Sequence, residues 1–556
     1  MGVCVQRRLR PARSRASAIC AALLALLLSA CTNEPAPPPT TTSTMQLKTF
    51  SFGTAADPAG LDPALVSDVD SNRVSRQIFE GLVTADPTTG EPAPALATSW
   101  NSINNGLGYE FTLREKVKFQ DGQPFNAAAV CMNFNRWFNY PVQKNPAAIP
   151  SAFKDLFRTF ANDAKNSVYK SCTVDSEYKL TVSLNLVRTG FLDALTQAAF
   201  GIASPAALKS GTADVLDQRR DSYQLSKFAL HPVGTGPYQL TSWQDGVVTL
   251  QQNPDYWGDK GQINTIKFIT YQQSQARSQA LLTGKIDGYD FVTPDNFDAL
   301  VKRGLQVQQR DPFSVFYLGL NQQIPALADI KVRQAISIAI DKDALVKKFF
   351  IDGSTSTNQF IPPKLSGFNN QVPGAGYDRE KARKLIKESS YRGAPLKFYY
   401  PLNVTRPYLP TPEKIYAEIA AELTAIGLNI KPVPVDWSDN YLEKVSSSGD
   451  HALHLLGLNG SYSDPDNFVG PLFGAPNAEF GPADSQLISK IERAKTLPDG
   501  AERSQAYQSI NADIASTIPA IPIAFPISAL ALSSRVSSYP VSPVLNEVFN
   551  KITLNS

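Results

Sequence analysis

The sequence predicts an α/β fold, because strand-like and helix-like segments alternate along the chain. Apolar residues take every second position in 109–114 and 179–186, which is typical of strands. In 330–340 they follow a helical period instead. This alternation favours α/β lobes over a β-sandwich or a helical bundle, and no repeat of a fixed short period is found. At 556 residues the chain is long enough for two to four domains.

The expected elements follow from local patterns. Alternating or continuous apolar runs predict strands at 47–52, 109–114, 179–186, 247–250, 265–271, 315–321, 396–400 and 429–435. Apolar residues at helical spacing, with capping residues before them, predict helices at 71–82, 126–137, 274–282, 330–340 and 411–426. Gly427 stands where a helix stop is expected. A turn is expected at 120–125, where Asp and Gly are adjacent.

Residues 1–31 have the three parts of a secretory signal. A basic stretch ends at Arg15, an apolar run covers 16–28, and small residues precede Cys31. The apolar run is shorter than the about 20 residues of a spanning helix. Small residues directly before a cysteine resemble the lipobox of bacterial lipoproteins, and this resemblance implies that Cys31 becomes the lipid-modified N-terminus. The alternative is a plain secretory signal cleaved near Ala30, with an incidental cysteine.

Residues 32–45 are predicted to form a tether. Pro, Thr and Ser dominate this segment, and such a composition favours extended conformations without a core. The arginines of the first 15 residues account for the formal net charge of +3, so the rest of the chain is near neutral or slightly acidic. No basic stripe remains, and nucleic acid is not expected as a partner. No later apolar run reaches 18 residues, so no spanning helix is expected.

Two cysteines, Cys131 and Cys172, remain once the N-terminal segment is set aside. In an oxidising compartment such a pair can form a disulfide. The chain-entropy picture gives its loop closure a value of roughly 3–4 kcal/mol. The alternative is two buried free thiols.

The motifs of common catalytic sites are missing from the sequence. It has no G-x-S-x-G, Walker A, H-E-x-x-H or C-x-x-C pattern. Gly234-Thr-Gly236 lacks the third glycine of a dinucleotide loop and precedes a strand rather than a helix. His231, His451 and His454 are the only histidines, so a histidine-dependent hydrolase has few residues to use. We therefore expect neither an enzyme, nor a cofactor, nor a metal centre.

Several segments, in one order along nearly the whole chain, resemble the family 5 (oligopeptide and dipeptide) solute-binding proteins of ABC importers. The segments are 61–68, 78–83, 94–100, 109–126, 233–238, 253–258, 329–342 and 464–468. Single segments of this length are weak evidence. Their shared order makes the resemblance specific.

The resemblance implies a two-lobe periplasmic-binding-protein (flytrap) fold with an extra domain inserted in the first lobe. The expected boundaries are 46–87, 205–308 and 518–556 for the first lobe, 88–204 for the inserted domain, and 309–517 for the second lobe. The resemblance also implies an exported monomer, held by lipid on the outer face of the cell membrane. Such a protein captures short peptides and delivers them to the membrane subunits of an ABC permease.

The resemblance further implies a carboxylate anchor. Dipeptide-binding members offer the arginine of an Arg-Pro-Tyr segment to the peptide carboxylate, and Arg406-Pro407-Tyr408 stands in the matching place. A guanidinium matches a carboxylate with two hydrogen bonds, worth about 1.5–3 kcal/mol each when charged. The alternative is an arginine in a surface loop, or one that pairs with a neighbouring Glu. The other ligand contacts expected between the lobes are Ser67, Asp68, Phe316, Asn321, Gly457, Leu458, Ser461 and Asp464.

The opposite anchor departs from the family pattern. Peptide binders of the family place an Asp just before the Asp-Pro or Glu-Pro step, where it pairs with the α-ammonium, but Ser461 stands at that position here. A hydroxyl cannot supply the charge, so either Asp464 or Asp68 substitutes, or the ligand lacks a free ammonium. Leu458 replaces the tryptophan of the dipeptide-binding members, which makes that wall of the pocket smaller.

Two alternative functions remain open at this point. Some family members bind haem or nickel complexes, and Asp450-His451-x-x-His454 is a possible ligand set. In a turn followed by a strand, however, we expect the two histidines on opposite faces, packed in the core or at its rim. The second alternative is a lipoprotein that keeps this scaffold but regulates an envelope enzyme instead of transporting.

Overall fold

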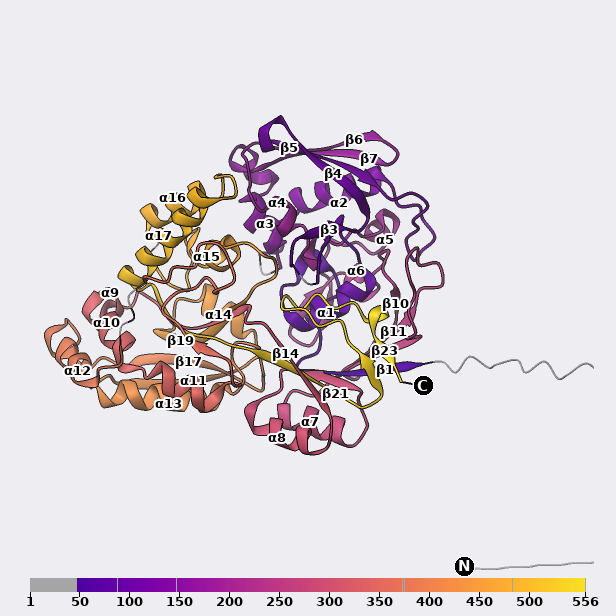
Figure 1. Ribbon diagram of the computed structural model, residues 1–556. Helices are drawn as coiled ribbons and strands as arrows, with labels where there is room; N and C mark the ends of the chain where they lie inside the picture. The colour runs from indigo at the N-terminus through magenta and orange to yellow at the C-terminus, as the bar shows by residue number, and fades with distance from the viewer. Residues whose placement is uncertain are drawn as a thin grey trace, which may run out of the picture. The chain divides into compact units, whose positions relative to one another are not determined.

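The computed structural model describes residues 48–555, apart from Thr88, Ala147, Pro373, Ala375 and Ala483. The predicted signal, Cys31 and the tether lie outside the described residues. Leu47–Ser556 form one compact unit. Its main parts are a seven-stranded, a six-stranded and a four-stranded sheet, each with helices packed against it (Figure 1). The predicted α/β class is therefore confirmed.

The seven-stranded sheet is the frame of the part that we call the first lobe. Its strands lie in the order β10 (Tyr238–Gln244), β11 (Val247–Gln252), β12 (Thr265–Thr270), β1 (Thr49–Thr54), β13 (Gly288–Asp290), β21 (Ser528–Leu532) and β14 (Gln306–Arg310). β1 pairs in parallel with β12 and β13, and the outer pairs are antiparallel. Helix α1 (Val69–Ile78) packs Val74 and Ile78 into the core cluster that contains Phe50 and Phe52. A second cluster joins the sheet to α7 (Ser274–Leu282) and α8 (Pro294–Lys302).

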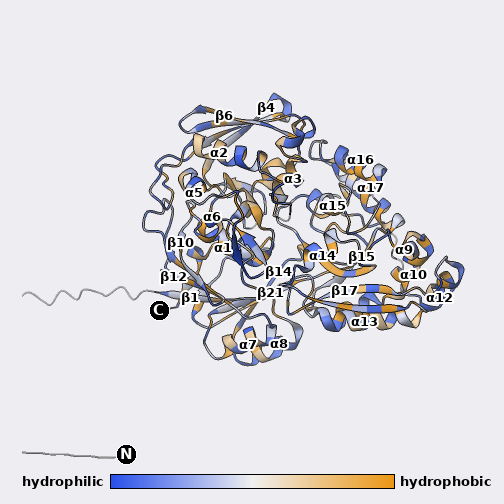
Figure 2. Ribbon diagram, turned by 180° about the vertical axis from the view of Figure 1, so that it is seen from behind, coloured by the Kyte–Doolittle hydropathy of each residue, from blue (hydrophilic) through white to orange (hydrophobic). Residues whose placement is uncertain are grey.

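The six-stranded sheet is the frame of the second lobe. Its order is β16 (Thr355–Ser356), β20 (Ala520–Phe525), β15 (Ser314–Leu320), β19 (Leu453–Asn459), β17 (Leu396–Leu402) and β18 (Ile430–Asp436). Helix α13 (Pro412–Ala425) covers it with Ile415, Ile419 and Leu423, which are spaced four residues apart and fully buried. Figure 2 shows hydrophilic and hydrophobic segments alternating along this helix, as expected for an amphipathic element.

The chain crosses between the two lobes twice, each time in the short segment between two consecutive strands. β14 ends at Arg310 and β15 begins at Ser314, while β20 ends at Phe525 and β21 begins at Ser528. β14 pairs with β21, and β15 with β20, so two neighbouring segments connect the sheets. The first crossing runs from Arg310 to Ser314, close to the boundary predicted at 309. The second lies between β20 and β21 and not at 518, because β20 hydrogen-bonds to β15 of the second lobe.

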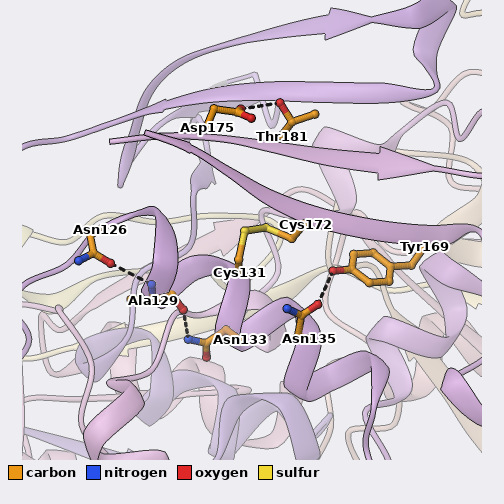
Figure 3. Close-up of a disulfide and its surroundings, with 9 residues drawn as sticks. All are labelled: Asn126, Ala129, Cys131, Asn133, Asn135, Tyr169, Cys172, Asp175 and Thr181. Carbon is orange, nitrogen blue, oxygen red and sulfur yellow. Dashed lines mark hydrogen bonds between the residues drawn. A yellow bond between two sulfur atoms is a disulfide. The ribbon is translucent and has the colours of Figure 1, made fainter. Parts of the chain in front are cut away.

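The four-stranded sheet, in the order β4 (Ala97–Ile103), β5 (Gly108–Leu113), β7 (Lys179–Leu184) and β6 (Tyr169–Ser176), is the frame of the inserted domain. Helix α2 (Ala127–Phe138) packs beneath it and begins at Asn126, whose side chain caps Ala129 N. Cys131 of α2 and Cys172 of β6 form the disulfide drawn in Figure 3, with their Cα atoms 5.2 Å apart. The predicted pairing is therefore confirmed.

The remaining elements are shorter or lie at the edges of these three parts. The helices are α3 (Ser151–Phe157), α4 (Phe191–Ala194), α5 (Pro205–Ser210), α6 (Lys227–Leu230), α9 (Pro325–Ala328), α10 (Ile330–Ala339), α11 (Lys342–Phe349), α12 (Arg379–Glu388), α14 (Tyr441–Ser447), α15 (Asp466–Phe473), α16 (Ser485–Ala494) and α17 (Ala501–Thr517). The short strands are β2 (Val83–Ala85), β3 (Pro92–Pro94), β8 (Gln218–Arg220), β9 (Tyr223–Leu225), β22 (Val536–Ser538) and β23 (Thr553–Leu554). Between residues 48 and 555, no described helix has the length and apolar content to cross a membrane.

One predicted helix differs from the observed one. α1 was expected at 71–82 but spans Val69–Ile78. It begins earlier because the Asp68 carboxylate caps the free N–H of Ser71. It ends earlier because Phe79 adopts an extended conformation. The start of α1 was not predicted, because the residues of its first turn are mostly polar.

Candidate functional site

The start of α1 brings two carboxylates to the surface between the lobes. Asp68 is the N-cap residue and accepts a hydrogen bond from Ser71 N at 2.9 Å. Asp70, in the first turn of the helix, is buried. Ser67 precedes them and is exposed. The capping preference of aspartate explains why this residue type begins the helix here.

Arg406 reaches the same place from the second lobe. It follows β17 in a tight turn that is closed by two backbone hydrogen bonds between Arg406 and Leu409. Its Nη1 donates to Asp70 Oδ2 at 2.8 Å, so an ion pair joins the two lobes. The guanidinium lies over the Trp437 ring at 4.4 Å, a favourable cation–π distance.

The Arg406 guanidinium is buried and incompletely partnered. Only 2% of the residue is exposed, yet Nε and Nη2 have no hydrogen-bond partner. A buried donor without a partner costs about 1–3 kcal/mol, and more when the group is charged. Arg406 also borders a cavity of about 10 Å³ that is walled by both lobes, with Phe291 and Ser528 on one side and Phe350 and Pro407 on the other. This cavity has room for about one water molecule.

Tyr408 and Gly457 lie against each other beside this group. A Cβ at Gly457 would stand 2.3 Å from Tyr408 Cγ, so only glycine fits beneath the ring. Burial raises the pKa of Tyr408 to about 12, and its hydroxyl therefore stays protonated at neutral pH. Leu458 follows on β19 and is half-buried. The structure thus brings Asp68, Arg406, Tyr408 and Gly457 into one region.

Ser461 lies at a different contact, between the second lobe and the inserted domain. Its Oγ donates to Gln197 Oε1 at 3.0 Å, and its backbone N donates to Asn467 Oδ1 at 2.7 Å. Both side-chain partners are neutral amides. Ser461 therefore donates both hydrogen bonds to neutral groups.

The Asp464 carboxylate already forms an ion pair inside the protein. Both of its carboxylate oxygens accept from Arg503 Nη2, at 2.9 and 2.7 Å, and only 4% of the residue is exposed. Gly190 of the inserted domain is so close that a Cβ there would stand 2.5 Å from Asp464 Oδ2. Asp464 is therefore better explained as a packing and ion-pairing residue than as a ligand contact.

Phe316 and Asn321 were expected to contact the ligand, but the structure places both in the core of the second lobe. Neither has exposed surface. The Phe316 ring packs near Phe350, with centroids 5.9 Å apart. The Asn321 amide donates to the carbonyls of Gly449 and His451, each at 3.0 Å. Sequence position alone did not reveal that these side chains point away from the junction.

His451 and His454 were expected on opposite faces, and this prediction is wrong. Their rings are 4.8 Å apart, because His451 precedes β19 and its side chain is free to fold toward His454. Both histidines are fully buried. The His451 ring contacts the backbone oxygen of Glu479, and the His454 ring contacts the Glu479 carboxylate. Burial lowers the pKa of His451 to about 4, so it is neutral at pH 7. Within the described residues, no group of three or more His, Cys, Asp or Glu is arranged to hold a metal ion.

Three partners of these residues were missed in the sequence. Asp70 holds Arg406, Trp437 lies under it, and Gln197 binds Ser461. Asp70 gave no distinct signal, because acidic residues are common in the first turn of a helix, where they favour the helix dipole. Trp437 and Gln197 come from segments 31 and 264 residues away from their partners, so no local pattern connects them.

Comparison with known proteins agrees with this architecture. The model of the bacterial extracellular solute-binding proteins, family 5, matches residues 91–480. The dipeptide-binding protein of Escherichia coli is 28% identical over 533 residues, which cover 92% of this chain and 96% of that protein. Heme-binding protein A of Haemophilus influenzae is 27% identical over 558 residues, covering 95% and 97%.

A solved structure shares the fold over almost the whole chain. The periplasmic binding protein DppA of Helicobacter pylori, in complex with the peptide STSA, superposes with a TM-score of 0.81 at 25% identity. The match covers 91% of this chain and 98% of that one. Because the family model spans well over half of the sequence, this chain belongs to the bacterial extracellular solute-binding proteins of family 5.

Proposed function

We propose that this protein captures short peptides between its two lobes and delivers them to the permease of an ABC importer. The observation that carries the proposal is the Arg406 guanidinium, which is buried at the lobe junction with Nε and Nη2 unpartnered. Every peptide with a free C-terminus offers a carboxylate that fits this edge with two hydrogen bonds. The names of the Escherichia coli and Helicobacter pylori proteins support the same ligand class.

The mode of binding follows from this anchor. Main-chain atoms are common to all peptides, so an anchor that holds the terminal carboxylate does not depend on sequence. Closure of the lobes removes water and lowers the local dielectric constant, which strengthens the charge pair. Tyr408, Gly457 and Leu458 would form the adjoining wall, and water can fill the space that smaller side chains leave.

Haem is the competing ligand, because a relative carries that name. The two histidines that suggested it are buried in the second-lobe core and bonded to Glu479. Iron ligation by either would require breaking these contacts and opening the core. The regulatory alternative has no specific observation in its favour, since the Ser461 contacts are explained by packing against the inserted domain.

The export route also belongs to the proposal. The basic, apolar and small-residue parts before Cys31 support lipid attachment at its thiol, and the tether at 32–45 would hold the folded unit away from the membrane. The protein would then act as a monomer on the outer side of the cell membrane. Replacing Cys31 with alanine should release it into the soluble fraction without changing ligand affinity.

Intrinsic fluorescence tests the ligand class. Trp437 packs on Arg406, so occupation of this site should change its emission. Titration with an equimolar mixture of dipeptides should give a saturable change that is reduced in the Trp437→Phe variant. A Soret band on adding haem, together with no response to any dipeptide, would contradict the proposal.

A further inference from the structure

Six lysine and arginine side chains surround the place where the chain enters the folded unit. Lys48 is the first described residue, and β1 begins directly after it. The other five come from segments that are far apart in the sequence, and all five are exposed, whereas Lys48 is half-buried. We call this set the basic face; its members are Lys48, Lys260, Lys267, Lys285, Arg535 and Lys551.

Contacts on one side of β1 join three of these residues. Gln262 Oε1 accepts from Lys48 Nζ at 3.2 Å and from a backbone N of β23 at 3.4 Å, so β1 and β23 meet here (Figure 1). Lys551, just before β23, lies with its Nζ 3.8 Å from Asp259 Oδ2. Lys260 is the next residue after Asp259, which places all three cations around the segment 259–262.

Contacts on the other side of β1 join the remaining three. Ser51 of β1 is paired in register with Lys267 of β12. Its backbone N donates to Asp287 Oδ2 at 2.9 Å, and Asp287 Oδ1 is 2.6 Å from Arg535 Nη1. Lys285 is two residues before Asp287. The six cations therefore lie on one continuous part of the first lobe, around the first half of β1.

The basic face has a net positive charge, although the body is slightly acidic. Its segments hold three acids, Asp255, Asp259 and Asp287, against the six cations. Two of those acids pair with Lys551 and Arg535, while the four remaining lysines form no ion pair within the residues that the structure describes. Apart from the five arginines of the first 31 residues, the chain has fewer lysines and arginines than acidic residues. A cationic face on such a body attracts an anionic surface from one side only.

The lobe junction lies at the opposite end of the same strand. Asp70, the partner of Arg406, accepts a hydrogen bond at 3.3 Å from the backbone N of Ala55, the residue that follows β1. Lys48 precedes β1, and a strand of six residues is about 20 Å long. A surface that covers the basic face therefore leaves the Arg406 region uncovered.

Resting on the lipid attachment at Cys31 proposed above, we propose that the basic face docks on the anionic phospholipid headgroups of the membrane. Cys31 precedes Lys48 by 17 residues, a length that spans at most about 60 Å. The anchor therefore keeps this face within reach of the headgroups. Each lysine close to an anionic membrane surface strengthens binding about fivefold. The lipid then holds the chain in the membrane, and the basic face sets which side of the folded unit rests on it.

Vesicle binding tests this docking without the lipid anchor. The polypeptide from Thr32 onward contains the whole compact unit Leu47–Ser556 and is made unlipidated. It is sedimented with vesicles of equal parts phosphatidylglycerol and phosphatidylcholine, and with vesicles of phosphatidylcholine alone as the neutral surface. The basic-face variant replaces three lysines that form no ion pair by glutamine: Lys260→Gln, Lys267→Gln and Lys285→Gln. The matched control removes three exposed lysines from α11 and α12 of the second lobe: Lys347→Gln, Lys381→Gln and Lys387→Gln.

The unmodified polypeptide and the second-lobe variant should bind the mixed vesicles at least tenfold more tightly than the neutral ones, and high salt should remove the difference. The basic-face variant should lose at least tenfold in affinity for the mixed vesicles. No preference for the mixed vesicles, an unchanged affinity in the basic-face variant, or an equal loss in the second-lobe variant overturns the proposal. Displacement by inorganic phosphate at constant ionic strength would assign the lysines to a free phosphate ion and also overturns it.

Amine-reactive labelling of the lipid-anchored full-length protein is the second measurement, and it needs no variant. Lys267 and Lys285 should be labelled at least twofold less in the mixed vesicles than in the neutral ones, while Lys381 is labelled equally in both. Equal labelling of all three lysines in the two kinds of vesicle overturns the proposal. Dipeptide affinity should be the same in all three polypeptides, so failure of the docking leaves peptide capture intact. Fractionation of Cys31→Ala tests the anchor separately, because the vesicles detect binding without it.

Discussion

Arg406 has two tasks that the sequence cannot separate. It stands in the Arg-Pro-Tyr segment that resembles a carboxylate anchor, and the structure adds a buried ion pair to Asp70 of the other lobe. Its position directly after a strand was predictable, because β17 and α13 follow clear patterns. Its partner was not, since Asp70 is 336 residues earlier in the chain. The ion pair therefore gives Arg406 a part in stability as well as in ligand binding.

A double-mutant cycle separates the two tasks. Arg406→Gln leaves the Asp70 carboxylate buried and unpaired, and should lower the free energy of unfolding by about 3–5 kcal/mol. Asp70→Asn added to it should recover most of that loss, because the uncompensated charge is gone. Dipeptide affinity should fall at least tenfold in both variants. Urea unfolding and calorimetry measure the two effects, and recovery of affinity in the double variant would mean that Arg406 does not bind ligand.

At the scale of elements, the turn Arg188-Thr189-Gly190 makes several of the contacts that hold the inserted domain to the second lobe. Arg188 and Arg158 both bind Glu492 of α16, the former at 3.0 Å. The Thr189 backbone N donates to Lys495 O at 3.0 Å and its hydroxyl to Leu497 O at 2.6 Å. These contacts close one side of the region between the lobes without touching Arg406.

Glu492 should make stability depend on acid pH. Burial raises its pKa, but Lys495 and Arg188 outweigh that effect and lower the pKa to about 2. Because this lies below the unfolded value near 4.3, the stabilisation is complete above about pH 4.3 and is lost as pH falls toward 2. Glu492→Gln should cost about 2–3 kcal/mol at pH 7 and flatten the profile between pH 4.3 and 2.

Asp513→Asn is the control for this prediction. It removes the exposed Lys490–Asp513 pair, which joins α16 to α17 and lies within the second lobe. Surface pairs contribute about 0–1 kcal/mol, so its unfolding profile should remain close to wild type. Equal losses of unfolding free energy in Glu492→Gln and Asp513→Asn would show that the turn 188–190 does not hold the inserted domain.

The disulfide gives the second prediction for an element. It joins α2 to β6 and closes a loop of 41 residues, so its removal by Cys131→Ala with Cys172→Ala should lower the free energy of unfolding by about 4 kcal/mol. Ligand affinity should not change, because the pair stabilises the inserted domain far from Arg406. A tenfold weaker affinity in the double variant than in the oxidised wild type, or no change in the free energy of unfolding, would contradict this assignment.

How much the sequence revealed also differs between elements. The helix predicted at 330–340 was found almost to the residue, because its apolar residues at helical spacing must be buried. The start of α1 was not, because its first turn is polar. The second crossing between lobes was misplaced, since β20 and β21 are both continuous apolar strands and only their partners distinguish them. The proximity of the His451 and His454 rings could not be predicted from a strand pattern, because both rings are held by contacts with Glu479 from a distant segment.

At the scale of the molecule, two sheets joined by two adjacent crossings can close and open about a narrow connection. The Arg406–Asp70 ion pair spans this opening, so a ligand carboxylate arrives where the lobes already attract each other. The central claim is that the captured ligand is a short peptide.

Native mass spectrometry of the protein, purified without refolding, tests this claim most directly. We expect a ladder of small added masses that match short peptides, reduced in the Arg406→Gln variant. A single discrete added mass that corresponds to haem or to a metal chelate would contradict the claim.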